Sequence, residues 1–414
     1  MVEKITENKY TDEEIEAILN KFGTVYLHKQ ITDRVEYIIG NDEQKDRFID
    51  FFNALMNYKT FMEKLEVSNL IPNLTMLLYG PPGTGKTSLT RAFAKKYEVN
   101  VCVVEADRLV TSLLGETIKN IRKVVEAAAD IAEINGPFVL FFDEIDAIGS
   151  ERSNIHEVGE IKRAVVSFLQ TIDRITYKGV ELAIIGATNH QQQLDSAIWR
   201  RFTYHLEFDF PKYKLRAEIL KSFINRIKRT GIGVDDSILS SISMELVKIS
   251  SIAEDLGNDV NEDFLMEEVQ KQNQNKLITL THGYSGSDIE RGTRVALFKA
   301  MGADPKKPQP LTYNMFSGSL ELVGGTATHV ERQEVLSSSN NISKDSEKSK
   351  LVEDFKEDID ENELESYLLK LKPVLEKIYY IFEKNDDFLT QSRGTNPIGK
   401  FYGIIEKLNK LKNG

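Results

Sequence analysis

A glycine-rich segment that ends in lysine and threonine is the first part of this sequence that could do chemistry. Residues 80–87 read GPPGTGKT, a full match to the pattern GxxxxGK[ST]. Glycines let the backbone curl so that successive N–H groups point at phosphate oxygens, and a following helix adds its positive N-terminal end. Lys86 would reach the β- and γ-phosphates, and the Thr87 hydroxyl would ligate Mg²⁺. The residues expected at the nucleotide are Pro82, Gly83, Thr84, Gly85, Lys86, Thr87 and Ser88.

A second segment places two carboxylates at the end of an apolar run. Residues 138–145 read FVLFFDEI, which predicts a buried strand followed by Asp143 and Glu144. Open α/β sheets bind ligands at the carboxyl ends of their strands. Asp143 is expected to hold Mg²⁺, directly or through water, and Glu144 to orient the attacking water. Because the pair follows a phosphate loop, we predict that it is catalytic.

A third apolar run and two arginines complete the candidate site. Residues 182–189 read LAIIGATN and end in Asn189, whose amide could bond the γ-phosphate or the attacking water. Arg200 and Arg201, in DSAIWRRF, are planar and permanently charged donors suited to phosphate. The alternative interpretation is a pair of surface arginines. The predicted catalytic set is Lys86, Asp143, Glu144, Asn189, Arg200 and Arg201.

These residues need a sheet to position them. Between residues 74 and 210, short apolar runs alternate with helical patterns, which indicates a parallel sheet covered on both faces. The expected strands are residues 74–79, 99–104, 138–142, 182–187 and 205–208. The expected divisions are a helical segment (1–65), a nucleotide-binding α/β domain (66–210), a helical domain (211–301) interrupted by a polar stretch (254–275), a Pro-, Gly- and Ser-rich linker (302–350) and a C-terminal helical segment (351–414).

Composition narrows the class of protein. The chain is 41% hydrophobic and 28% charged, which is typical of a soluble globular protein. A net charge of -11 argues against a broad basic surface for nucleic acid. Cys102 is the sole cysteine, and six histidines show no ligand spacing, so no metal is expected beyond nucleotide-bound Mg²⁺. The apolar runs are too short to span a bilayer and the N-terminus has no signal-peptide core, so we expect a cytoplasmic protein without membrane contact.

Taken together, these segments resemble the AAA family of ATPases. GPPGTGKT resembles the Walker A motif of that family, LFFDEIDAI (140–148) the Walker B motif, GATN (186–189) the sensor 1 segment, and GYSGSDIERG (283–292) a stretch of the helical lid. The resemblance covers residues 35–301. It implies a P-loop NTPase fold, in which helices sandwich a parallel sheet and a small all-α lid follows. It also implies Mg²⁺-dependent ATP hydrolysis in a homo-oligomeric ring, usually a hexamer.

The resemblance also implies several contacts. Gly40 falls in the segment that contacts adenine, and Gly286 and Ser287 fall at the lid contact to the nucleotide. Arg200 and Arg201 fall at the arginine finger, which completes the neighbouring subunit's site. Because this sequence is shorter here than the family's RxxR spacing, either arginine or both could act. Arg291 and Arg294 are candidate γ-phosphate sensors that we leave outside the catalytic set.

How the chain would handle a substrate is less defined. Residues 111–117 read TSLLGET, which places Leu113 where remodelling members carry an aromatic pore-loop residue, and a second pore-facing loop is expected near residues 152–157. The favoured function is ATP-driven remodelling of a protein substrate that the sequence does not identify. One alternative is an ATP-gated assembly scaffold with little turnover, and another is a nucleic-acid-associated ATPase. The amphipathic pattern at 364–381 could dock on the ATPase core or engage a partner.

Overall fold

The computed structural model describes residues 9–65, 73–109, 116–146, 155–257, 260–272, 276–302 and 308–326. All of these residues belong to one compact unit, Met1–Glu331. Leu113, the first part of the second expected pore loop, most of the expected linker and the C-terminal helical segment lie outside the described residues. The described part of the chain contains no helix that is both long and apolar enough to cross a membrane.

A six-stranded sheet in the order β1-β3-β4-β5-β2-β6 is formed by strands between residues 23 and 207. All strands except β1 run parallel, as the sequence predicts. Every residue of β4 and β5 is buried, because helices cover both faces of these uniformly apolar strands. The sheet confirms the predicted α/β class. Its strands are β1 (Gly23–Tyr26), β2 (Thr75–Tyr79), β3 (Asn100–Val104), β4 (Phe138–Phe142), β5 (Leu182–Thr188) and β6 (Tyr204–Glu207).

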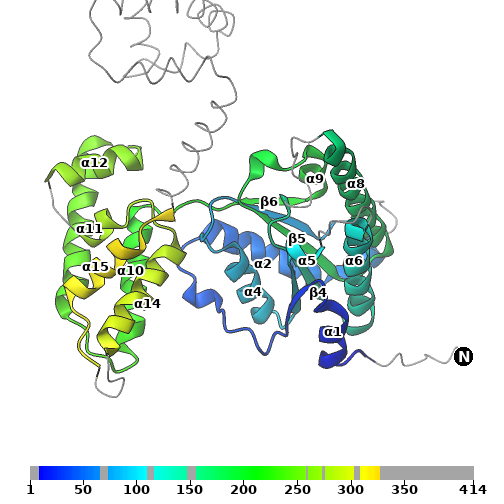
Figure 1. Ribbon diagram of the computed structural model, residues 1–414, viewed down its shortest axis with the longest axis horizontal. Coiled ribbons are helices and arrows are strands. Elements are labelled where there is room, and N and C mark those ends of the chain that lie inside the picture. Colours follow the sequence, from blue (N-terminus) through cyan, green and yellow to red (C-terminus); the bar gives the residue numbers. More distant parts are fainter. Residues whose placement is uncertain are drawn as a thin grey trace, which may run out of the picture. The chain divides into compact units, whose positions relative to one another are not determined.

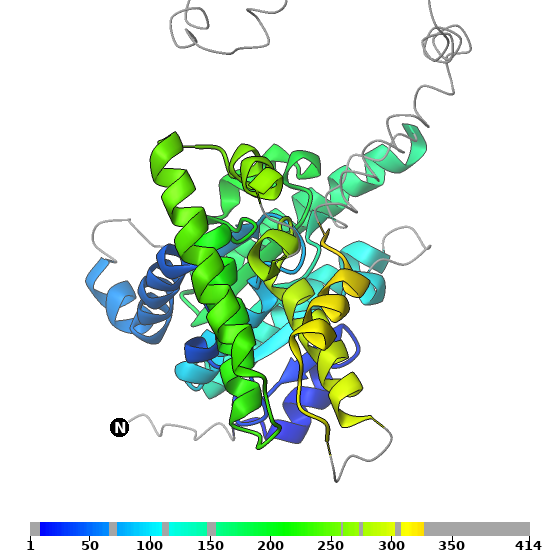
Figure 2. The ribbon, with the colours of Figure 1, turned by 90° about the vertical axis from the view of Figure 1, so that its left-hand side faces the viewer.

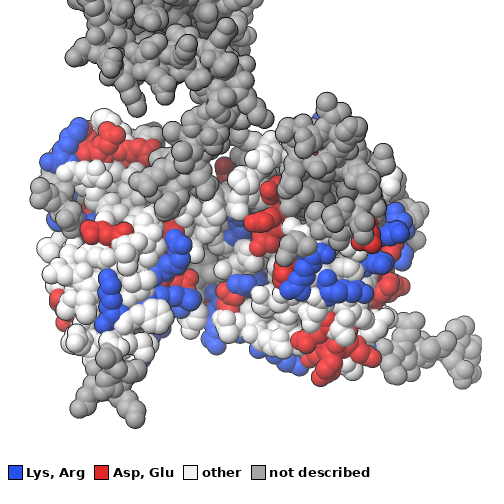
Figure 3. Space-filling view, viewed as in Figure 1, with Lys and Arg blue, Asp and Glu red and all other residues white. Residues whose placement is uncertain are grey.

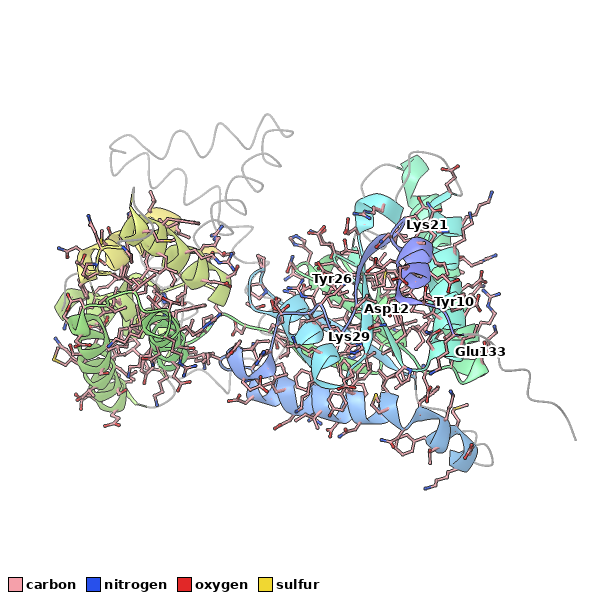
Figure 4. All side chains as sticks on the ribbon, turned by 90° about the horizontal axis from the view of Figure 1, so that it is seen from below. Tyr10, Asp12, Lys21, Tyr26, Lys29 and Glu133 are labelled. Atoms are coloured by element: carbon pink, nitrogen blue, oxygen red, sulfur yellow. The ribbon has the colours of Figure 1, made fainter. Side chains whose placement is uncertain are left out.

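The expectation that residues 1–65 are helical is wrong at β1. This strand pairs antiparallel with β3, and a Cβ atom at Gly23 would lie 2.0 Å from the Val103 carbonyl oxygen, so the close approach requires glycine. The helix before it, α1 (Asp12–Leu19), begins at a capping box formed by Thr11 and Glu14. The Tyr10 backbone N–H donates to Asn135 Oδ1 at 3.1 Å, which places α1 beside α6 (Figure 4). The N-terminal segment thus adds one edge strand to the sheet and one helix beside α6.

Two helical layers sandwich the sheet (Figure 1). On one face, α2 (Asp42–Met56) and α4 (Lys86–Lys96) bury an aromatic cluster in which the Phe48 and Phe93 ring centroids are 5.2 Å apart. On the other face, α6 (Glu116–Asn135) and α8 (Ile155–Lys178) pack with α1. The shorter elements are η1 (Val35–Tyr37), α3 (Tyr58–Leu65), α5 (Ala106–Leu109), η2 (Gln191–Gln193) and α9 (Ser196–Arg201).

The helices between residues 213 and 323, here called the lid, form a bundle with its own hydrophobic core. It differs from expectation in two places. Helix α12 forms inside the segment 254–275 that was expected to be a polar interruption, and burial of Leu265, Met266 and Val269 stabilises it. Helix α15 forms inside the segment 302–350 that was expected to be a linker, and it packs along α14 (Figure 2). A Cβ atom at Gly292 would lie 2.6 Å from Leu320 Cδ2, so glycine permits that packing. The lid helices are α10 (Tyr213–Lys228), α11 (Asp236–Leu256), α12 (Glu262–Gln272), α13 (Leu277–Leu280), α14 (Gly286–Met301) and α15 (Tyr313–Val323). The division at residues 65, 210 and 301 stays a prediction.

Candidate nucleotide site

A cleft of about 620 Å³ brings most of the predicted site residues together. Its walls are the loop between β2 and α4, the turns after β4 and β5, the segment 32–41, and parts of the lid helices α10 and α14. The parallel strands β2, β4 and β5 end at the same edge of the sheet, which is why segments distant in sequence meet there. The predicted residues that line the cleft are Pro82, Gly83, Thr84, Gly85, Lys86, Thr87, Ser88, Asp143, Glu144, Asn189, Gly286 and Ser287.

The phosphate loop has the backbone that a bound anion requires. Gly83 and Gly85 adopt φ angles of 76° and 102°, a region that favours glycine. Gly85 precedes α4 and offers no side-chain cap, and the first helical bond joins Leu89 N to Gly85 O at 2.8 Å. The N–H groups of residues 86–88 therefore lack helical acceptors and suit phosphate oxygens.

Lys86 holds its ammonium group inside this loop. Its Nζ donates to the carbonyl oxygens of Gly80 (2.6 Å) and Pro81 (2.8 Å) and to Asn189 Oδ1 (2.8 Å). Burial lowers the pKa of Lys86 to about 8, and the Asp143 carboxylate opposes that shift. An anionic phosphate next to Lys86 would stabilise the charged form of this desolvated side chain.

The oxygen atoms suited to Mg²⁺ lie beside the lysine. Burial raises the pKa of Asp143, although the Glu144 backbone N–H, the Lys86 ammonium and the Thr87 hydroxyl each act to lower it. A carboxylate and a hydroxyl are hard oxygen donors, and Mg²⁺ commonly binds few protein ligands together with substrate phosphates. Thr87 and Asp143 thus fit a nucleotide-bound Mg²⁺. Glu144 is exposed at the cleft, with a φ of 53°.

Gly40 and the two arginines do not line the cleft. Residues Ile39 and Asn41 on either side of Gly40 do line it, whereas Gly40 has a φ of 76° and would place a Cβ atom 2.6 Å from Leu215 Cδ1. Glycine at position 40 therefore lets Leu215 of α10 pack closely against this part of the backbone. Arg200 and Arg201 lie exposed on α9, and Arg201 Nε pairs with Asp173 Oδ1 at 3.2 Å. Their assignment as catalytic residues stays a prediction.

The two candidate sensor arginines differ from each other. Arg294 lines the cleft and pairs with Glu290 at 2.6 Å. Arg291 instead pairs with the buried Asp288 at 2.6 Å and does not line the cleft. Asp288 also completes a capping box at the start of α14, in which its carboxylate accepts the Ser285 backbone N–H and its own backbone N–H donates to Ser285 Oγ.

Two features of the cleft were missed by sequence reasoning. Asn41 adopts a φ of 55°, and its Nδ2 donates to the Thr84 carbonyl oxygen at 3.3 Å, so it supports the phosphate loop from the start of α2. The sequence offered two signals of this role for Asn41. It stands directly before a helical pattern, and asparagine tolerates a left-handed backbone. At the rim, Arg34 and Arg226 lie over the Tyr37 ring, 5.8 and 5.2 Å from its centroid. Arg34 lies three residues before Tyr37, but no local pattern links these two residues to Arg226.

A family model matches the part of the chain that contains most of the sheet, and several related proteins are similar to this chain. Residues 76–210 match the family model described as "ATPase family associated with various cellular activities (AAA)". An uncharacterized AAA family ATPase of Sinorhizobium fredii, y4kL, is 44% identical over 146 residues, which are 35% of this chain and 42% of that protein. The cell division cycle protein 48 homolog of Archaeoglobus fulgidus is 29% identical over 238 residues, 57% of this chain and 26% of that protein. The chain therefore spans less than half the length of these curated relatives.

A solved structure supports the fold alone. The FIGL-1 AAA domain, crystallised in complex with ADP, superposes with a TM-score of 0.51 at 22% identity. The superposition covers 80% of this chain and 97% of that domain. It therefore extends beyond the segment that the family model matches.

Proposed function

Since this chain carries an AAA ATPase domain over residues 76–210, we propose that it hydrolyses ATP in the cleft described above and uses the turnover, as an oligomeric ring, to remodel proteins. The observation that carries the proposal is the position of Lys86. Its Nζ lies 2.8 Å from Asn189 Oδ1, beside Asp143, in a cleft that Glu144 also lines. A phosphate-binding cation, a candidate metal ligand and a water-orienting carboxylate thus share one cavity.

The residues of this chain would divide the work as follows. The N–H groups of residues 86–88 and the Lys86 ammonium would bind and orient the phosphates. Mg²⁺, held by Thr87 and Asp143, would supply positive charge next to the reacting phosphate. Glu144 would orient a water molecule and accept its proton, and Asn189 would fix the position of that water or of the γ-phosphate.

The position of the two arginines supports the proposal of an oligomer. Arg200 and Arg201 are exposed on α9 and do not line the cleft of their own chain. A guanidinium group next to the reacting phosphate stabilises the charge that develops there. If these arginines act in hydrolysis, a second copy of the chain must present them. A hexamer is the ring size that the family resemblance favours.

Two other functions remain as alternatives. A gated scaffold that binds ATP with little turnover would not need Glu144 in the cleft, and its presence favours hydrolysis. A nucleic-acid-associated ATPase would need a basic surface. On the face drawn in Figure 3, the described Lys and Arg side chains are interspersed with Asp and Glu, which agrees with the net charge of -11. Neither alternative is favoured by a specific contact among the described residues.

Steady-state ATP hydrolysis over a range of protein concentrations tests the proposal. We expect the activity per chain to rise with concentration and to fall at least about a hundredfold in Glu144→Gln, because the proton acceptor is lost. The double variant Arg200→Ala/Arg201→Ala should also be inactive, because either arginine or both could act. The exposed Glu133→Gln and Arg229→Ala serve as matched controls and should keep native activity.

Each result has a defined meaning. A native chain that binds ATP but turns it over no faster than Glu144→Gln at any concentration would refute hydrolysis and favour the gated scaffold. Activity per chain that does not depend on concentration, together with an active Arg200→Ala/Arg201→Ala double variant, would refute shared sites. Stimulation by DNA would favour the nucleic-acid alternative.

A further inference from the structure

The turn that carries Glu144 has an unusual backbone. Glu144 adopts a φ of 53°, a left-handed conformation that a residue with a long side chain rarely occupies. Such conformations persist where the surrounding structure holds them, and they cluster at functional sites. What holds this turn therefore also determines where the Glu144 carboxylate lies.

Backbone contacts anchor the turn on both sides of Glu144. Before it, the Asp143 N–H donates to the Val104 carbonyl oxygen of β3 at 3.4 Å. After it, the Ile145 N–H donates to the Ala187 carbonyl oxygen of β5 at 2.9 Å, and the Ile145 side chain is fully buried. A Cβ atom at Gly186 would lie 2.8 Å from Ile145 Cδ1, so the glycine lets this side chain lie on β5. Glu144 is thus the exposed residue between two fixed neighbours.

One buried hydroxyl adds a third anchor and links the turn to Asn189. Thr188 Oγ1 donates to Asp146 Oδ1 at 2.6 Å and accepts the His190 backbone N–H at 2.9 Å. A threonine hydroxyl has one donor hydrogen and can accept at the same time, so both bonds can form together. The Asp146 bond fixes the segment after Glu144, and the His190 bond fixes the backbone around Asn189.

Thr188 itself is remote from the ligand position. Its side chain is only 1% exposed, and it does not line the cleft. Asn189, the next residue, does line the cleft and accepts from the Lys86 ammonium at 2.8 Å. The loss of the Thr188 hydroxyl would therefore reach the reacting groups through the segments that carry Glu144 and Asn189.

We propose that Thr188, through its bonds to Asp146 and His190, is a positioning residue that holds the Glu144 carboxylate and the Asn189 amide in one geometry for hydrolysis. This inference rests on the proposed function. Misplacing a reacting group by about 1 Å can cost about a hundredfold in rate. The Thr188 hydroxyl bonds both segments that carry water-positioning groups, so its loss should slow the chemical step more than it weakens nucleotide binding.

The test compares Thr188→Val with Thr188→Ser in the full chain. Valine keeps the shape of threonine but can neither donate nor accept, whereas serine keeps the hydroxyl. We expect Thr188→Val to lower kcat at least about tenfold while KM for ATP and the Kd for ADP stay within about threefold, because the phosphate loop is unchanged. Thr188→Ser should retain kcat within about threefold because it preserves both hydrogen bonds.

Two further variants separate positioning from stability. Asp146→Ala removes the acceptor and should reproduce the kcat loss of Thr188→Val, whereas Asp146→Asn keeps an acceptor oxygen and should retain most activity. In a Glu144→Gln background, Thr188→Val should cause little further loss, because groups that act through one another are not additive. The Tm of each variant reports any loss of folding.

The outcomes distinguish this inference from the proposed function. An active native chain in which Thr188→Val keeps native kcat would overturn the positioning role alone. A Thr188→Val chain that loses nucleotide affinity and Tm in parallel with kcat would also overturn it, in favour of a structural role. A native chain no faster than Glu144→Gln would overturn both the positioning role and the proposed hydrolysis.

Discussion

Replacing Arg216 should destabilise the lid more than any exposed substitution. This arginine of α10 is 1% exposed, and its Nη1 donates to Glu262 Oε1 and to the Pro211 carbonyl oxygen, both at 2.9 Å. Its Nε and Nη2 lie 3.4 and 3.3 Å from the Ile278 carbonyl oxygen. Burial lowers the pKa of Arg216, and Glu262 opposes that shift. One side chain thus joins α10 to α12 and to the start of α13.

The expected loss of unfolding free energy depends on whether each variant leaves a buried charge without its partner. Removing one partner of a buried ion pair costs about 3–5 kcal/mol. The Glu262 side chain is 19% exposed and keeps some access to water, so we expect Arg216→Ala to lower the free energy of unfolding by about 3 kcal/mol, the lower end of that range. The double variant Arg216→Met with Glu262→Gln fills the volume and leaves no charge, so it should lose about 1 kcal/mol.

Urea unfolding followed by circular dichroism measures both values, provided that the slope of the transition is unchanged. Arg229→Ala, which replaces an exposed arginine at the C-terminal end of the same helix, should stay within about 0.5 kcal/mol of the native value. Leu215 and Ile219 of the same helix line the cleft, so Arg216→Ala should also weaken ADP binding. A loss below about 1 kcal/mol for Arg216→Ala, or equal losses for the single and double variants, would refute the buried-pair reasoning.

Two smaller predictions concern Asn41 and Cys102. Asn41→Gly keeps the left-handed backbone but loses the bond to Thr84, so the Kd for ADP should rise about threefold to tenfold, the equivalent of one hydrogen bond. Asn41→Ala should bind more weakly still because alanine disfavours that φ, and equal Kd values for the native chain and both variants would contradict the contact. Burial raises the pKa of Cys102 to about 12, so the native chain should resist Ellman's reagent at pH 8 and react fully in urea. Rapid labelling of the native chain would contradict that environment.

The central fold could be predicted because its signals are local. Each parallel strand is a continuous apolar run, and the phosphate loop is one contiguous motif whose glycines set its backbone. Strand β1 gave no such signal. It is a four-residue strand that depends on pairing with β3, about one-fifth of the chain away. Helix α15 was hidden by the Pro-, Gly- and Ser-rich composition around it, although Phe316 and Leu320 bury against α14.

The site residues that could be predicted are those at the ends of buried strands and those in the phosphate loop. Asp143, Glu144 and Asn189 follow buried strands, so a parallel sheet brings them together. The supporting contacts could not be found in the same way. The bond from Asn41 to Thr84 and the bond from Thr188 to Asp146 join residues that lie 43 and 42 positions apart. Polar residues of these types are common in turns, and only the tertiary fold selects the partner.

The position of α9 leads to a prediction about mixed oligomers. Lys86→Ala should abolish ATP binding in its own chain but leave Arg200 and Arg201 intact, because the arginines lie on α9 outside the cleft. If Arg201 is the arginine that acts, Arg201→Ala should leave the cleft of its own chain intact but offer no working arginine to a neighbour. Each variant alone should be inactive. A mixture lets Lys86→Ala chains complete the sites of Arg201→Ala chains.

The regained activity can be estimated from random assembly. In an equal mixture half of the chains carry an intact cleft, and half of those clefts face a neighbour with an intact arginine, so a head-to-tail ring should regain about a quarter of native activity. Mixing should be done under conditions that allow subunit exchange, and the rate should be measured after equilibration. Lys86→Ala mixed with Lys86→Ala/Arg201→Ala is the matched control and should stay inactive. If the equal mixture also stays inactive while each chain still assembles with the native protein, Arg201 acts within its own chain or only in folding, and the shared-site reasoning fails.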